Sequence, residues 1–141
     1  MLAISLVNAV IIALVVIIHY EFLFQFTMLM PKLRIRHRFR IVFGVLAALM
    51  AHVIEVFIFG FAYFLMDRGE SWGSLRGNYE SDLGGSIYFS FTAYTTLGLG
   101  DIEPIGPLRF LVGLESLVGF VLITWTASFL YLEMTRNWDS Q

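Results

Sequence analysis

The sequence contains no cysteine, only three prolines, and few charged residues, which make up 14% of its 141 positions. Without cysteine the chain can form neither a disulfide nor a cysteine metal site. Nucleotide-binding loops, hydrolytic triads and zinc-ligand spacings are also missing, so we expect no enzymatic activity and no nucleic-acid partner. No apolar segment has arginine at every third position, which argues against a voltage sensor of the usual kind.

Hydrophobic residues make up 58% of the sequence and are concentrated in three long segments, residues 2–30, 41–66 and 107–134. About 20 apolar residues in a helix span the hydrocarbon core of a bilayer. The first segment is longer than the apolar core of a signal peptide, and no basic residue precedes it, so we interpret it as a retained helix. The sequence therefore predicts an integral membrane protein with three transmembrane helices.

The distribution of charge predicts the orientation of these helices. Five of the nine Lys/Arg residues lie between the first two apolar segments: Lys32, Arg34, Arg36, Arg38 and Arg40. Short basic loops stay in the cytoplasm, so we expect loop 31–40 and tail 135–141 to be cytoplasmic and the N-terminus to be outside. The loop can also bind anionic lipid through residues 32–40.

The segment between the second and third apolar segments is then external. Residues 67–81 are polar and rich in Gly and Ser, as in an exposed loop. Residues 82–95 predict a helix capped by Asp82 or Ser86, and its apolar part is too short to span a membrane. Such a re-entrant helix must be buried in protein or line water.

The stretch TTLGLGD, Thr95–Asp101, follows this helix. Glycine adopts positive φ without steric cost, so Gly98 and Gly100 allow successive carbonyls to point to one side. The carbonyl oxygens that can then coordinate a dehydrated cation, together with the Thr96 hydroxyl, belong to Thr96, Leu97, Gly98 and Leu99. One chain supplies one oxygen per ring, so a pore requires several chains around an axis.

This motif resembles the TVGYGD filter signature of potassium channels. The resemblance extends from about residue 41 to 131, and it implies an all-α membrane protein with a potassium-channel-like pore domain at 41–134. By that resemblance the outer helix is 41–66, the pore helix 82–95, the filter 96–101 and the inner helix 107–134. It further implies a homotetramer with K⁺ as the permeant ion, and residues 1–30 form an extra transmembrane helix.

The sequence departs from the family pattern around the filter. Leu99 replaces the usual tyrosine, so a hydroxyl strut to the pore helix cannot form, and Leu97 replaces the usual valine. Apolar packing is therefore expected around the filter. Asp101 then needs a new partner, because Thr92 occupies a position that is glutamate in some relatives. The residues expected to support the filter are Thr95, Gly100, Asp101, Tyr88, Phe89 and Thr92.

The third apolar segment resembles the inner helix of these channels. Gly119 lies where the family often has a hinge glycine. The face expected to line the cavity and inner gate comprises Phe120, Ile123, Ala127, Ser128 and Tyr131, with Tyr131 as the narrowest ring.

Several ionisable residues fall within the apolar segments: His19, Glu21, His52, Glu55 and Glu115. Residues at such depth usually face protein or water and have a partner. His52 and Glu55 are three apart and share a helix face. Two interpretations stay open, a proton-sensitive gate and hydrogen bonding that fixes helix packing; a metal site is not expected, since no third ligand is evident.

The sequence thus predicts a potassium-selective channel in a prokaryotic inner membrane, without a soluble regulatory domain. One alternative is a weakly selective cation channel, because Leu99 weakens the filter. A potassium transporter subunit is a further alternative, although such chains carry four unlike pore segments. A non-conducting scaffold is disfavoured by the intact Gly98, Gly100 and Asp101.

Overall fold

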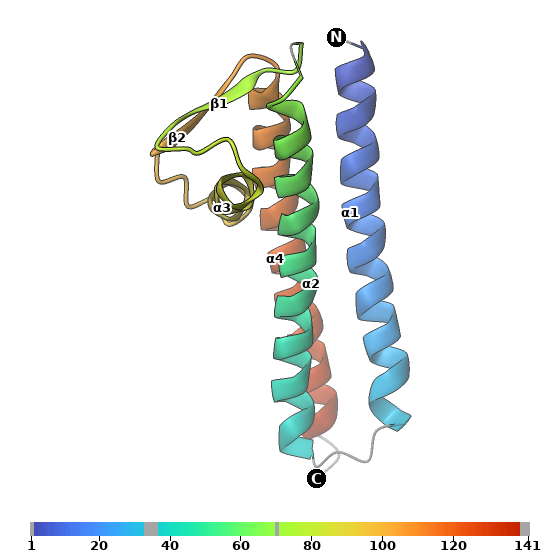
Figure 1. The fold of residues 1–141 in the computed structure, drawn as a ribbon. Helices are drawn as coiled ribbons and strands as arrows, with labels where there is room; N and C mark the ends of the chain where they lie inside the picture. The colour runs from blue at the N-terminus through green and yellow to red at the C-terminus, as the bar shows by residue number, and fades with distance from the viewer. Residues whose placement is uncertain (1, 33–36, 70, 139–141) are drawn as a thin grey trace.

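Three long helices dominate the computed structural model, which describes residues 2–32, 37–69 and 71–138. They are α1 (Leu2–Leu29), α2 (His37–Met66) and α4 (Leu108–Trp138), and they run side by side along the molecule (Figure 1). A short 3₁₀ turn, η1 (Met30–Lys32), follows α1. All three long helices are long and apolar enough to cross a membrane, which confirms the prediction of an all-α, multi-pass membrane protein.

Two of these helices extend beyond their predicted limits. The predicted loop 31–40 is shorter than expected, because α2 already begins at His37 and not at residue 41. The inner helix continues past residue 134 to Trp138. Arginine has good helix propensity, so arginines next to an apolar segment, such as Arg40 and Arg136, can continue its helix. Residues 33–36 of the predicted basic loop lie outside the described residues.

A fourth helix, α3 (Leu83–Tyr94), lies across the long helices and is seen nearly end-on in Figure 1. Its N-cap is Asp82, whose carboxylate accepts a hydrogen bond of 2.7 Å from the Gly85 amide, so of the two predicted caps Asp82 is the one used. Thr95 forms the C-cap. At twelve residues α3 is too short to span a bilayer, as predicted.

Two glycines let α3 sit directly against its neighbours. A Cβ on Gly60 of α2 would lie 2.8 Å from the Cα of Ile87, and a Cβ on Gly119 of α4 would lie 2.1 Å from the carbonyl oxygen of Tyr94. Small residues at such contacts let helix backbones approach closely. The fold therefore fixes α3 at both its middle and its C-terminal end.

The segment between α2 and α4 contains a small antiparallel sheet that the sequence did not predict. Strand β1 (Ser74–Gly77) pairs with β2 (Ile102–Ile105), and the register places Arg76 opposite Glu103. Asp67 holds the start of β1, because its Oδ1 accepts a hydrogen bond of 2.8 Å from the Leu75 amide. The predicted loop 67–81 is thus partly ordered as a strand that is tied to the chain after TTLGLGD.

The buried core lies where α3 meets α2 and α4. It is formed by large side chains from all three helices and from the sheet: Phe59, Tyr63, Leu75, Phe89, Tyr94, Leu108, Leu111 and Leu122. The helix α1 packs beside α2 and α4 through a single stripe that includes Val15, Leu23 and Phe26. The start of α1 lies at the same end of the molecule as β1 and β2, as the predicted topology requires (Figure 1).

Candidate functional site

The TTLGLGD stretch has an alternating backbone conformation. The φ angles of Thr96, Gly98 and Gly100 are +60°, +52° and +78°, while the residues between them keep negative φ. Left-handed backbone is disfavoured for residues with a side chain, so a threonine there is unusual. The two glycine positions agree with the sequence prediction, and Thr96 adds a third position that the glycine pattern alone could not reveal.

This stretch is anchored to the C-terminal end of α3. The Thr96 amide donates to the Ala93 carbonyl at 3.0 Å, and the Gly98 amide donates to the Thr92 carbonyl at 3.1 Å. The Thr95 hydroxyl donates to the Phe91 carbonyl at 2.7 Å. These bonds use carbonyls of the last turn of α3, where the helix dipole is negative, and they place the stretch directly over that end.

One side of the stretch is open within the subunit. The side chains of Leu97 and Leu99 are 63% and 58% exposed, and nothing lies within 4 Å of a Cβ built on Gly98 or Gly100. A cavity of about 370 Å³ beside the stretch is lined by Phe89, Thr92, Val112 and Ser116 together with residues of the stretch itself. The stretch is therefore held at its ends and leaves its backbone accessible.

Asp101 has a partner that sequence reasoning missed. The Tyr88 hydroxyl donates to Asp101 Oδ2 at 2.8 Å, so the expectation of purely apolar packing around the filter was wrong at Tyr88. This hydrogen bond raises the pKa of Tyr88 above its ordinary value, because it favours the protonated phenol next to a carboxylate. The carbonyl of Asp101 also accepts a bond of 2.9 Å from the Asn78 amide, which ties it to the chain beyond β1.

The residues of α4 predicted to line the cavity differ in burial: Gly119 is buried and the others are exposed. Gly119 is buried against the Tyr94 carbonyl, so its missing side chain serves a close contact within a continuous helix. The remaining members of the predicted face are exposed in the subunit, as a cavity or interface requires: Phe120, Ile123, Ala127, Ser128 and Tyr131.

Glu115 joins three helices. Its carboxylate accepts hydrogen bonds from the Tyr63 hydroxyl of α2 and, at 2.5 Å, from the Ser90 hydroxyl of α3. Glu115 is 0% exposed. The packing interpretation applies to this residue, because the carboxylate holds α4 to the middle of α3.

Glu55 lies in a second buried cluster, whose third ionisable side chain, that of His19, the sequence did not pair with Glu55. His19 Nδ1 lies 2.7 Å from Glu55 Oε1, and His52 Nδ1 lies 3.1 Å from Glu55 Oε2. The Tyr94 hydroxyl donates to the same Oε2. His19 comes from α1, which is distant in sequence, so no local spacing could have placed it here. Glu21, by contrast, is exposed and accepts a bond from Gln25 at 2.6 Å.

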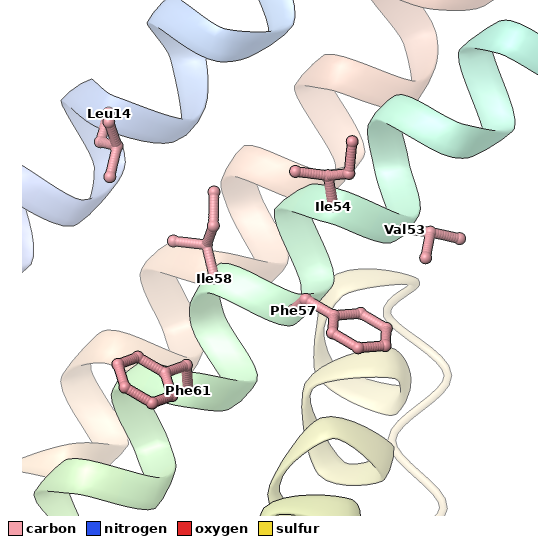
Figure 2. Close-up of a pocket in the computed structure, with 6 residues that line it drawn as sticks. All are labelled: Leu14, Val53, Ile54, Phe57, Ile58 and Phe61. Atoms are coloured by element: carbon pink, nitrogen blue, oxygen red, sulfur yellow. The ribbon is translucent and has the colours of Figure 1, made fainter.

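A groove on the outer surface of α1 and α2 has only apolar lining. It has a volume of about 570 Å³ and is lined by Leu14, Val53, Ile54, Phe57, Ile58 and Phe61. Figure 2 shows Leu14 on α1 across from Ile54 and Ile58 on α2. Such a surface suits lipid tails or another apolar helix, and it offers no ligand for an ion.

Comparison with known families agrees with this arrangement. A family model described as "Ion channel" matches residues 51–136, which include α3, the TTLGLGD stretch and most of α2 and α4. No curated protein and no solved structure was found to match the chain. The match begins within α2, so α1 lies outside the part shared with the family.

Proposed function

Because the chain belongs to the ion channel family, we propose that it forms a homotetramer that conducts K⁺ passively across a membrane. The permeant ion would be coordinated by the backbone carbonyl oxygens of Thr96, Leu97, Gly98 and Leu99 and by the Thr96 hydroxyl. These oxygens replace the hydration shell of the ion. The process is flow down an electrochemical gradient, and we expect no catalysed reaction.

The observation that best supports this proposal is the alternation of φ at Thr96, Gly98 and Gly100. An extended strand directs successive carbonyls to opposite sides, whereas alternation between left- and right-handed backbone brings them to a common side. A row of carbonyls facing one direction has no internal hydrogen-bond donor. A cation on the symmetry axis would satisfy these oxygens.

The surroundings of the stretch also favour a cation. The C-terminal end of α3 carries a partial negative charge, and the chain that follows the filter contains Asp101 and Glu103 at the outer mouth. Negative groups at a pore entrance raise the local cation concentration. Arg76 lies opposite Glu103 in the sheet and offsets part of that field.

The same geometry supports the proposed assembly of several subunits around one axis. One subunit supplies one oxygen per ring, and the open side of the filter and the exposed face of α4 are left for neighbouring subunits. Fourfold symmetry closes such a ring, since heterologous contacts generate closed rings when the rotation closes. We further propose that the N-terminus lies outside and the C-terminus lies in the cytoplasm of a prokaryotic inner membrane, because of the basic residues at 32–40.

A weakly selective cation channel on this architecture is the second candidate. Leu99 lacks the hydroxyl that would brace the filter, which favours a filter that deforms around smaller ions. The Tyr88–Asp101 hydrogen bond supplies a different brace at the outer end of the filter. Selectivity therefore depends on whether this one bond keeps the oxygen rings at a fixed size.

Ion flux from liposomes tests the proposal. Vesicles that contain the purified chain are expected to release K⁺ down a gradient, with block by Ba²⁺ and little Na⁺ flux. Gly98→Ala should abolish the flux, because alanine is strained by about 1–2 kcal/mol in left-handed backbone. Gly113→Ala is the matched control, since Gly113 lies in a helix with nothing within 4 Å of an added Cβ.

Each outcome has a distinct meaning. Equal K⁺ and Na⁺ flux that Gly98→Ala abolishes would favour the weakly selective channel. A tetramer that is folded, as judged by size-exclusion chromatography, but passes neither ion would refute the proposal of a conducting channel. A folded protein without fourfold symmetry would refute the filter mechanism itself.

A further inference from the structure

Two imidazole rings in the core share the same pair of partners. The Nδ1 atoms of His19 and His52 lie 2.7 and 3.1 Å from the two carboxylate oxygens of Glu55. Their Nε2 atoms lie 3.2 and 3.1 Å from one hydroxyl, that of Thr126 on α4. Both rings therefore present the same edge to the carboxylate and the opposite edge to the hydroxyl.

These four contacts cannot all be hydrogen bonds while Glu55 is ionised and both imidazoles are neutral. A neutral imidazole has one N–H group, and the carboxylate requires it at Nδ1 of both rings. Both Nε2 atoms are then acceptors, but the Thr126 hydroxyl has one hydrogen to donate. One contact therefore sets two lone pairs against each other, unless a further cation is present, either a second proton on one imidazole or a metal ion.

The charge of the cluster leads to the same requirement. Glu55 is 0% exposed and lies within a segment long enough to cross the membrane. A lone carboxylate in such surroundings is costly and requires a positive partner. Among the described residues, Glu55 pairs with the two imidazoles and with no Lys or Arg, so its positive partner is either a proton on one imidazole or a metal ion.

We propose that this cation is a divalent transition metal, with Zn²⁺ the best match, bound by His19 Nδ1, His52 Nδ1 and the Glu55 carboxylate. The three donor groups lie within 4.8 Å of one another. Zn²⁺ prefers His nitrogen and carboxylate oxygen in a tetrahedron with bonds of about 2.0–2.1 Å. The ligand atoms of such a tetrahedron are about 3.3 Å apart, so small shifts from 2.7 and 3.1 Å suffice.

The surrounding groups fit a metal centre. With metal on both Nδ1 atoms, each ring carries its hydrogen on Nε2, and the two lone pairs of the Thr126 hydroxyl accept both. Ligating histidines usually donate their second N–H to such an outer partner, which fixes the tautomer and the ring orientation. The Tyr94 hydroxyl, 2.9 Å from His52 Nδ1, supplies a fourth donor atom, an oxygen, on the metal side.

A metal here would tie the extra helix to the pore domain. His19 belongs to α1, whereas His52 and Glu55 belong to α2. Tyr94 ends α3 just before the filter, and Thr126 lies on α4. The His52 side chain is 15% exposed, which leaves a route for the ion to enter. The site is independent of whether the chain conducts K⁺.

Metal analysis of the full-length chain tests this proposal. After growth with added Zn²⁺ and purification in detergent, the wild-type chain should retain about one Zn²⁺ per subunit by mass spectrometry. His19→Ala and Glu55→Gln should each lower the zinc content more than about tenfold. Glu21→Gln, an exposed carboxylate on α1, is the control and should leave the content unchanged.

A second measurement uses only the wild-type chain, so it does not depend on whether the variants fold. Zn²⁺ added to chelator-stripped protein should raise the melting temperature by about 5 °C or more, and Co²⁺ should give the visible spectrum of a tetrahedral site. The proposal is wrong if wild-type protein holds no more zinc than Glu55→Gln and if Zn²⁺ leaves its melting temperature unchanged. In that case the cluster holds a proton.

Discussion

The contact between Gly119 and the C-terminal end of α3 makes a sharp prediction about stability. In Gly119→Ala the new Cβ would lie 2.1 Å from the Tyr94 carbonyl oxygen and 2.9 Å from the Tyr94 carbonyl carbon. Both are backbone atoms, which cannot rotate away, so α3 and α4 must separate by about 1 Å. Ala therefore destabilises the protein at this position, although it is the better helix former.

The magnitude follows from two opposing effects. Overpacking costs about 1–3 kcal/mol, with backbone contacts at the upper end, and replacing Gly by Ala in a helix returns up to about 1 kcal/mol. The net loss for Gly119→Ala is about 1–2 kcal/mol. Gly113 lies on the same helix with open space around it, so Gly113→Ala should be neutral or stabilising by up to about 1 kcal/mol.

Thermal denaturation of the two variants in detergent distinguishes these effects. Gly119→Ala should melt about 5–10 °C below Gly113→Ala, with wild type between them. If the proposed K⁺ conduction is correct, potassium flux should also fall in Gly119→Ala, because Tyr94 immediately precedes the TTLGLGD stretch. Equal melting temperatures for the two variants would refute the view that Gly119 is required by a close helix contact.

Three further predictions concern the segment between α2 and α4. Tyr88→Phe removes the hydrogen bond to Asp101 and should lower K⁺/Na⁺ discrimination, measured as a shift of the reversal potential in mixed gradients. Asp67→Asn should destabilise the protein by about 1–3 kcal/mol in thermal melts, because its carboxylate accepts bonds from the Leu75 amide and two hydroxyls. Burial raises the pKa of Tyr79, so the folded state binds the phenol proton more tightly than the unfolded state does. The free energy of unfolding should therefore fall as the pH rises above about 10. Tyr79→Phe should reduce this fall in thermal melts between about pH 9 and 11.

Each of these predictions has a control in the chain. Tyr20→Phe changes an exposed phenol on α1 and should leave the reversal potential unchanged; an equal shift in both variants would contradict the role given to Tyr88. Glu80→Gln neutralises an exposed carboxylate and should leave thermal stability unchanged. If it lowers stability as much as Asp67→Asn does, the effect of Asp67→Asn comes from charge and not from its hydrogen bonds. If the melting temperature of Tyr79→Phe falls with rising pH as steeply as that of wild type, other tyrosines cause the fall.

Local sequence signals were sufficient for the helices of the fold and for the glycine-containing stretch. The three apolar segments, the short capped helix at 83–94 and the paired glycines each depend on residues close together in the chain. Apolar length and hydropathy predict the membrane helices, and the φ preference of glycine predicts the left-handed positions. The ends of α2 and α4 were misjudged because basic residues such as Arg40 and Arg136 do not stop a helix.

Pairings between distant residues could not be deduced in this way. The Tyr88–Asp101 bond, the β1–β2 sheet and the contact of Gly119 with Tyr94 each join residues more than ten positions apart. Hydrogen-bond partners across such separations depend on how the helices are rotated and shifted against each other. The left-handed Thr96 was missed for a related reason, since threonine adopts that conformation only when its surroundings impose it.

The sequence by itself determined that this chain spans a membrane three times and places a glycine-alternating stretch after a short helix, because apolar length and glycine spacing are properties of adjacent residues. Only the tertiary structure decided that His19 of the added helix meets His52 and Glu55. Side chains from separate helices come into contact only when the helices pack. A buried carboxylate such as Glu55 then requires hydrogen-bonding or positively charged partners at that position.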